Sequence, residues 1–195
     1  MENIAKKKKR PFISYTIFAL SDEQIKKLYS VCERMSDYIM ILLAIRYGFR
    51  REDIVDIKIN NIDTKGKTLT YHENKKNKDR TIPLESDVVQ ELVRYIGTID
   101  QKKQRGYLFP FHDGTTAWRR FQDLCYAADI AVPVGRTGRP FHSLRGTCVK
   151  LRQAQGWTLN EVSALIGDDP ETVAIHYSTV TLPELANKMN KEGVK

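Results

Sequence analysis

One stretch of this chain, residues 68 to 84, interrupts an otherwise helical pattern and so limits the folds that the chain can adopt. Leu69 and Tyr71 alternate there with polar residues, a lysine-rich turn follows, and residues 81 to 84 read Thr-Ile-Pro-Leu. Alternation with a period of two on both sides of a turn predicts a β-hairpin. The predicted fold class is therefore α+β and mostly helical, with one small antiparallel β-sheet.

Helical patterns account for most of the remaining chain. Ser21 and Gln24 form a capping box, and Thr158 with Glu161 offers a second one. Apolar spacing and glycine stops predict further helices at residues 37–46, 51–57, 86–96, 115–128, 143–155, 158–166 and 182–189. Residues 1–19 resemble a basic tail or linker, and residues 20–195 are predicted to form one domain.

The charge of the chain favours a polyanionic partner. Its formal net charge is +8 at pH 7, and the basic residues gather at residues 6–10, 75–80, 102–105 and 136–139. Nucleic acid is the leading candidate for such a partner. Charge alone does not decide the matter, because many basic proteins bind no nucleic acid specifically.

Membrane insertion and a disulfide framework are not indicated. The longest apolar run, residues 38–45, is too short to cross a bilayer and is not placed like a signal peptide. We therefore expect no membrane partner and a cytoplasmic location. Cys32, Cys125 and Cys148 show no metal-like spacing, and an odd number argues against paired disulfides. The cysteines are expected to be reduced and at least partly buried, with no metal or cofactor.

Two patterns place a cation where it could act on a phosphate. Arg50 follows the glycine stop at Gly48, and Asp53 three residues later could orient its guanidinium. Taken alone, this pattern is typical of a surface helix start with an ion pair. The turn from Lys75 to Arg80 could present a mobile ammonium, although such turns are usually solvated loops.

A third pattern combines a titratable group with a second arginine. His142 and Arg145 lie three residues apart, which puts both side chains on one helical face. The histidine could exchange a proton, and the arginine could hold two oxygens of a phosphate. Alternatively, the two residues have no catalytic role, and the pair is a histidine at the edge of the core beside a surface arginine. Downstream, Tyr177 closes the segment that begins at Leu165.

In order and spacing, these patterns resemble the catalytic domain of tyrosine recombinases, the phage integrase family, over residues 20 to about 191. Gly48 to Asp53 resembles the family's Gly-x-Arg-x-x-Glu motif, with aspartate in place of glutamate. The resemblance implies five catalytic residues: Arg50, Lys75, His142, Arg145 and the nucleophile Tyr177. Lys76 remains an alternative to Lys75. Further DNA contacts are expected from Lys76, Lys78, Arg80, Arg136 and Arg139.

The same resemblance implies a mechanism. Tyr177 would attack a phosphodiester of duplex DNA and form a 3′-phosphotyrosyl bond, while Arg50 and Arg145 neutralise the nonbridging oxygens. Lys75 would protonate the leaving 5′-oxygen, and His142 would assist proton transfer or position the phosphate. The bond energy is kept in the phosphotyrosine, so the resemblance implies neither ATP nor a metal ion.

Asp168 departs from the family pattern, which usually has histidine or tryptophan at this position. An ionised aspartate would repel a phosphate rather than donate a hydrogen bond to it. Three interpretations are open: Asp168 turns away from the phosphate and supports Arg145 or a backbone amide, nearby His176 or another donor replaces the missing group, or activity is reduced. Alternatively, Asp168 is the N-cap of a helix that begins near Pro170.

The resemblance also implies an assembly. Family members form tetramers on DNA, so a homotetramer on duplex DNA is expected, while the state without DNA is left open. Leu182, Leu185 and Met189 could form an apolar stripe on a helix at about residues 182–190 that docks on a neighbouring protomer, or the helix packs on its own domain. The chain is either a minimal recombinase or a fragment of a longer integrase, of prokaryotic or viral origin.

Two other functions compete with recombination. The first is a DNA-binding protein of the same fold with impaired chemistry, for which Asp168 is the motivating residue. The second is a type IB topoisomerase-like enzyme, which would share the chemistry but relax DNA without exchanging partners.

Overall fold

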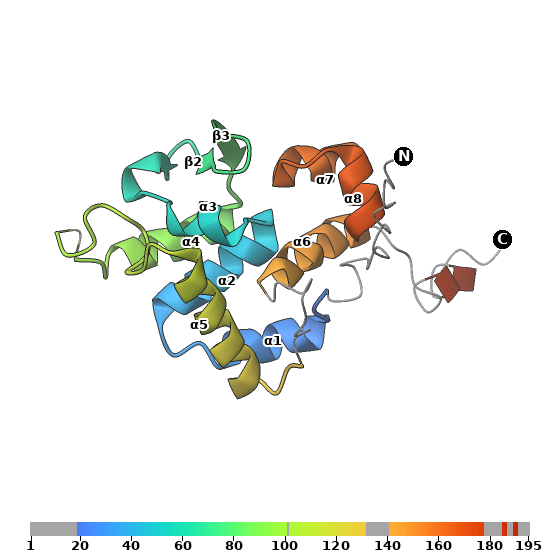
Figure 1. Cartoon of the computed structure of the whole chain (residues 1–195), viewed down its shortest axis with the longest axis horizontal. Coiled ribbons are helices and arrows are strands. Elements are labelled where there is room, and N and C mark those ends of the chain that lie inside the picture. Colours follow the sequence, from blue (N-terminus) through green and yellow to red (C-terminus); the bar gives the residue numbers. More distant parts are fainter. Residues whose placement is uncertain (1–18, 101, 132–140, 178–184, 187–188, 191–195) are drawn as a thin grey trace, which may run out of the picture.

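A computed structural model of the chain describes residues 19–100, 102–131, 141–177, 185–186 and 189–190 (Figure 1). Their principal elements, in chain order, are α1 (Asp22–Ser30), α2 (Met35–Tyr47), α3 (Arg51–Val55), the 3-10 turn η2 (Ile59–Asn61), β1 (Ile62–Asp63), β2 (Thr68–Glu73), β3 (Lys78–Pro83), α4 (Ser86–Ile96), α5 (Gly114–Ala127), α6 (His142–Ala154), α7 (Leu159–Ile166) and α8 (Pro170–Tyr177). The predicted fold class, mostly helical with a small antiparallel sheet, is confirmed.

Helix α2 forms the centre of the core. It is apolar on nearly all sides, and Ile39, Ile41 and Leu43 are completely buried. Full burial of each such side chain stabilises the fold by roughly 1.5–3 kcal/mol. Helix α2 packs against α4 and α6, which brings the start of α6 close to the end of α2 (Figure 1).

The sheet has the strand order β1-β2-β3, and both pairs are antiparallel. Leu69, Tyr71 and Glu73 are buried and alternate with less buried residues along β2, so Glu73 continues the inward face of the strand. Figure 1 shows β2 and β3 at the top of the molecule, with α1 and α5 at the bottom. The sequence prediction missed β1, since two residues carry too short a pattern to recognise.

Most predicted helices are confirmed within a few residues, and the two capping boxes form as expected. The helix predicted at residues 51–57 is too long, because α3 ends at Val55. The carbonyl of Ile57 instead accepts a hydrogen bond from the backbone N–H of Leu108, 2.8 Å away. Helix α5 starts one residue earlier than predicted, since Asp113 caps it by accepting from the N–H of Thr116.

The C-terminal stripe is only partly described. Residues 185–186 and 189–190 are helical, and the side chains of Leu185 and Met189 are 48% and 69% exposed. Leu182 and the basic tail at residues 1–18 lie outside the described residues, so neither the domain boundary nor the docking of this helix is tested.

The three cysteines are free, as expected, with Cys125 and Cys148 buried and Cys32 partly buried. Burial raises the pKa of Cys148 to about 12, which keeps its thiol protonated at neutral pH. Across the ranges described above, no helix is long and apolar enough to cross a membrane. Within those same ranges, no group of three or more His, Cys, Asp or Glu side chains is arranged to hold a metal ion.

Candidate active site

Arg145 lies in the first turn of α6, and its side chain is only 1% exposed. Its guanidinium donates hydrogen bonds to the carbonyl oxygens of Gly48 and Ile166, the latter at 2.8 Å. These carbonyls lie at the C-terminal ends of α2 and α7. A helix C-terminus carries carbonyls without helical partners and a partial negative charge. The fold thus builds a buried site for one cation where two helices end.

Two glycines allow these helix ends to approach each other. Gly48 ends α2 with φ of 66°, and Gly167 ends α7 with φ of 75°, a left-handed conformation that other residues rarely adopt. A Cβ atom at Gly48 would lie 2.8 Å from Cγ2 of Ile166. The sequence pattern identified Gly48 as a helix stop, and the structure adds that it makes room for Ile166.

Arg50 immediately precedes α3, and carboxylates surround its guanidinium. Its Nη1 atom donates to Oε1 of Glu73 at 2.8 Å and lies 3.7 Å from Oδ2 of Asp53, while Nη2 donates to Oδ1 of Asp168 at 2.6 Å. Asp53 was predicted to orient Arg50, but Glu73 is the closer partner. Asp53 itself accepts from the backbone N–H and side-chain amide of Asn74.

Glu73 was missed by the sequence interpretation. Its side chain is completely buried, and Oε2 accepts no hydrogen bond in the described part of the chain, although Nε of Arg80 lies 3.8 Å away. A buried carboxylate needs a cation nearby, because desolvation disfavours its charge. The period-two pattern of Leu69 and Tyr71 did contain the signal, since it places residue 73 on the same inward face.

Asp168 joins the two arginines. Its Oδ1 accepts from Arg50 at 2.6 Å and its Oδ2 accepts from Arg145 at 2.5 Å. Burial alone would raise the pKa of Asp168, but the nearby charges of Arg145, Arg50 and Lys75 outweigh burial and lower the pKa below its ordinary value of 3.8. The carboxylate is therefore ionised at neutral pH.

The structure decides between some of the interpretations of Asp168. The N-cap alternative is wrong, because α8 begins at Pro170, directly after Asp169, and the Asp168 carboxylate is bound to the arginines. The contact with Arg145 agrees with the first interpretation. The carboxylate does not turn away from the site, however, because it also contacts Arg50. The side chain of His176 lies outside the described residues, so its suggested role as a donor is untested.

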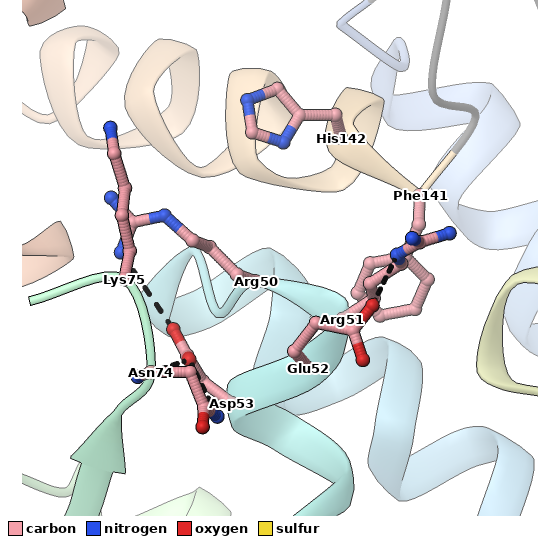
Figure 2. A pocket seen from close by; sticks show the side chains of 8 residues that line it. All are labelled: Arg50, Arg51, Glu52, Asp53, Asn74, Lys75, Phe141 and His142. Atoms are coloured by element: carbon pink, nitrogen blue, oxygen red, sulfur yellow. Dashed lines mark hydrogen bonds and ion pairs between the residues drawn. The ribbon is translucent and has the colours of Figure 1, made fainter. Parts of the chain in front are cut away.

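An open pocket of about 600 Å³ lies next to this cluster. Arg50, Lys75 and His142 line it, together with Arg51, Glu52, Asp53, Asn74 and Phe141. Figure 2 shows that these side chains come from the start of α3, the hairpin turn and the start of α6. Three of the five residues that the sequence pattern singled out therefore line one pocket, and the fourth, Arg145, is connected to Arg50 through Asp168.

The two candidate lysines of the hairpin differ in their surroundings. Lys75 lines the pocket and lies close enough to Asp168 to lower its pKa. Lys76 is not among the pocket-lining residues and lies 3.9 Å from the exposed carboxylate of Asp169. The geometry thus places Lys75 at the pocket and Lys76 beside Asp169, while the role of either lysine stays a prediction.

Tyr177 is the last residue of α8, which packs against α6 and α7. Helix α8 starts two residues after Asp168, so the turn that contacts both arginines also leads into the helix that ends at Tyr177. The side chain of Tyr177 lies outside the described residues. Its role as nucleophile therefore stays a prediction.

The predicted DNA-contacting residues fall into three groups. Lys76 and the exposed Lys78 lie on the hairpin. Arg80 is mostly buried instead: it donates to the hydroxyl of Tyr71 at 2.8 Å and to the carbonyl oxygens of Ala164 and Leu165. Its bonds connect the hairpin to α7, which indicates a structural role, while DNA contact stays untested. Arg136 and Arg139 lie outside the described residues.

Comparison with known proteins gives a consistent result. Residues 19–182 match the phage integrase family. The chain is 29% identical to tyrosine recombinase XerA of Pyrococcus horikoshii over 198 residues, which cover 98% of this chain and 67% of that protein. It spans 62% and 56% of two further XerA recombinases, from Pyrococcus furiosus and Saccharolobus solfataricus.

Solved structures show the same fold. A crystal structure of XerA recombinase superposes with a TM-score of 0.75 at 21% identity, over 91% of this chain and 65% of that one. The catalytic domain of bacteriophage HP1 integrase superposes with a TM-score of 0.65 at 18% identity, over 90% and 95% of the two chains. A lambda integrase tetramer bound to a Holliday junction gives 0.62 at 16% identity, over 84% and 51%.

The family match covers most of the chain and includes every residue of the cluster described above. The fold, with its small antiparallel sheet beside packed helices, is also that of the solved recombinase structures. The chain belongs to the phage integrase family.

Proposed function

We propose that this chain is a site-specific tyrosine recombinase that cleaves and rejoins duplex DNA. The observation that carries the proposal is that Arg50 and Lys75 line one pocket, while Arg145 is joined to Arg50 behind it through Asp168. Arg50 and Arg145 are 118 and 23 residues away from Asp168 in sequence, yet both contact its carboxylate. A group of cations assembled from distant segments at an open pocket suits an anionic substrate.

In the proposed first step, the Oη atom of Tyr177 attacks the phosphorus of a DNA phosphodiester. The new Oη–P bond forms as the bond from phosphorus to the 5′-oxygen breaks. Arg50 and Arg145 neutralise the nonbridging oxygens, and removal of either should slow cleavage by about 10²-fold or more. Lys75 donates a proton to the leaving 5′-oxygen, and His142 positions the phosphate or takes up the tyrosine proton.

Rejoining reverses this step. The 5′-hydroxyl of a partner strand attacks the 3′-phosphotyrosyl bond and releases Tyr177, so the number of phosphoester bonds does not change. Exchange between two duplexes calls for several protomers on DNA, and we propose a homotetramer. The lambda integrase tetramer on a Holliday junction supports this proposal, as do the exposed apolar side chains of Leu185 and Met189.

Trapping the covalent intermediate tests the proposed activity. The binding sequence is first identified by selecting the duplexes that the protein retains from a random pool. The test duplex then carries a nick close to the cleavage point, so that the short leaving strand diffuses away and the covalent adduct accumulates. Denaturing electrophoresis should then show a protein–DNA adduct with the wild type and none with Tyr177→Phe. Tyr126→Phe is a matched control, since Tyr126 is 79% exposed and lies in α5, away from the pocket residues.

The two alternative functions predict different results from the same material. A DNA-binding protein with impaired chemistry would retain the duplex but form no adduct. A type IB topoisomerase-like enzyme would form the adduct and relax supercoiled DNA, yet give no recombinant product from two marked duplexes. Formation of both adduct and recombinant product supports the recombinase.

A further inference from the structure

The carboxylate of Asp168 contacts Arg50 and Arg145 in the way that a bound anionic ligand would. Its two oxygens accept from two different guanidiniums, Oδ1 from Arg50 at 2.6 Å and Oδ2 from Arg145 at 2.5 Å. Two nonbridging oxygens of a phosphodiester held between these arginines would make the same kind of contact. Asp168 thus occupies, as part of the protein, the position that an anionic ligand of both arginines would take.

The arginines are consequently already neutralised. Arg50 and Arg145 together face three carboxylates, those of Asp53, Glu73 and Asp168. A phosphate that approached these two arginines while all three carboxylates remained in place would meet the Asp168 carboxylate on the guanidinium nitrogens that it needs. Like charges at short distance in a buried setting repel strongly. One carboxylate must therefore move before both arginines can hold a phosphate.

Asp168 is the carboxylate best placed to move. Glu73 is completely buried in β2 and paired in register with Lys78, and Asp53 is held in α3 by two hydrogen bonds from Asn74. Asp168 lies instead in the short turn between α7 and α8. Both hydrogen bonds described for its carboxylate come from the arginines, so an anion that takes over those donors also removes what holds Asp168 in place.

We propose that Asp168 is an internal anion that occupies the phosphate site, so that a DNA phosphate binds by displacing it from Arg50 and Arg145. The inference rests on the proposed function, since the incoming anion is taken to be DNA phosphate. Exchange begins at Arg50, which lines the open pocket, whereas Arg145 is almost completely buried. Displacement also frees the turn that leads into α8 and Tyr177.

Titration with inorganic phosphate tests the exchange without any DNA chemistry. Asp168→Asn removes the competing charge with little change in size, so its affinity for phosphate should exceed that of the wild type by about tenfold or more. Asp169→Asn is the matched control: it removes the neighbouring charge, but the Asp169 side chain is 80% exposed and pairs with Lys76 rather than with an arginine. Its phosphate affinity should stay within about twofold of the wild type.

A double variant locates the bound phosphate. In Asp168→Asn with Arg50→Gln, the gain should disappear, because one of the two proposed donors is lost. Equal phosphate affinity in the wild type and Asp168→Asn would overturn the proposal, and so would a gain that persists in the double variant. Isothermal titration calorimetry measures these phosphate affinities. Chloride keeps the ionic strength constant as the phosphate concentration changes, so that general charge screening does not alter the measured affinity.

Loss of Asp168 could also unfold the protein, because it leaves buried Arg145 without its carboxylate. The measurement then becomes phosphate-dependent refolding followed by circular dichroism. Asp168→Asn should regain its helical signal as phosphate is added, at concentrations where chloride has no effect; failure of phosphate to restore the fold would overturn the proposal. These outcomes do not depend on adduct formation, so the displacement of Asp168 and the activity of Tyr177 can fail separately.

Discussion

Asp168 and Arg145 form an ion pair in which Oδ2 and Nη2 are 2.5 Å apart and both side chains are nearly buried. Arg145 also binds two backbone carbonyls, which carry only partial charges. Among the residues that the structure describes, the Asp168 carboxylate is therefore the full negative charge in direct contact with this buried cation. The same pair links the stability of the domain to the availability of the arginine for a substrate.

Asp168→Asn should reduce the free energy of unfolding at neutral pH by roughly 3 kcal/mol, because it leaves a buried cation without its counter-ion. The pKa of Asp168 is lowered in the folded state, so its stabilising contribution is present above its ordinary value of 3.8 and is lost as the pH falls through the lowered folded value. The stability gap between wild type and Asp168→Asn should thus be constant near neutrality and close below pH 3.8.

Urea unfolding in phosphate-free buffer at a series of pH values measures this gap. Asp169→Asn, at the neighbouring exposed carboxylate, should show only a small gap at every pH. Burial raises the pKa of Asp53, although Asn74 and Arg50 oppose this rise, so Asp53 also makes stability depend on pH. This contribution is common to the wild type and the variant, and it cancels when their free energies of unfolding are subtracted. A gap that widens toward low pH would contradict the assigned ion pair.

Gly48→Ala should destabilise the domain more than Gly106→Ala does. Both glycines have positive φ, 66° and 79°, but a Cβ at Gly48 would lie 2.8 Å from Ile166, whereas nothing lies within 4 Å of a Cβ at Gly106. The conformation alone should cost about 1–2 kcal/mol in each variant, and the crowding at Gly48 should add roughly 1–3 kcal/mol.

Thermal or urea unfolding compares the two glycine variants. Gly48→Ala should also slow DNA cleavage, since the Gly48 carbonyl holds the guanidinium of Arg145. Equal losses of stability in the two variants would show that α2 and α7 do not approach as closely as described.

Lys75→Ala should slow cleavage of ordinary DNA by about 10²–10⁴-fold, the usual contribution of a general acid. A substrate with sulfur in place of the bridging 5′-oxygen tests this role, because a thiolate leaves without needing a proton. Cleavage of the sulfur substrate should be nearly equal in wild type and Lys75→Ala, as measured by adduct formation over time. Lys76→Ala is the control and should lose much less activity; the reverse ranking would assign the proton to Lys76.

His72 should titrate above its ordinary pKa of 6.5. Its Nδ1 atom lies 2.8 Å from Oδ1 of Asp79 across the hairpin. This hydrogen bond raises the pKa of His72 and outweighs desolvation, which lowers it, and a hydrogen bond with Asn77 raises the pKa further. Protonated His72 therefore supports the lysine-bearing hairpin below pH 6.5, and this support is lost as the pH rises through the raised pKa.

Nuclear magnetic resonance of the imidazole protons measures this pKa directly. Asp79→Asn should return it toward 6.5, while Asp63→Asn, at a carboxylate of β1 that binds backbone N–H groups instead, should leave it raised. A His72 pKa that does not respond to Asp79→Asn would contradict the cross-strand pair.

Local patterns in the sequence predicted the parts of the site that depend on local structure. The glycine stop before Arg50, the lysine turn and the His-x-x-Arg spacing on one helix each follow from a few neighbouring residues, and three of the resulting side chains line the pocket. Glu73 could also have been recognised, because the alternation of Leu69 and Tyr71 continues to it.

The contacts between distant segments could not be predicted in this way. Whether the turn at Asp168 meets Arg50, 118 residues earlier, depends on how α7 packs against α6, and no pattern of neighbouring residues specifies that. Arg80 shows the same limit. In sequence it belongs to a solvated basic turn, but in the fold it donates to carbonyls of α7.

The most direct measurement identifies the residue that is joined to DNA. After the adduct is trapped, nuclease treatment and trypsin should leave the peptide of residues 153–188, which contains a single tyrosine, Tyr177. Mass spectrometry should find this peptide carrying a 3′-phosphonucleotide on Tyr177. A nucleotide attached to any other residue, or the unmodified peptide alone from a confirmed adduct, would contradict the claim that Tyr177 attacks the phosphate held by Arg50 and Arg145.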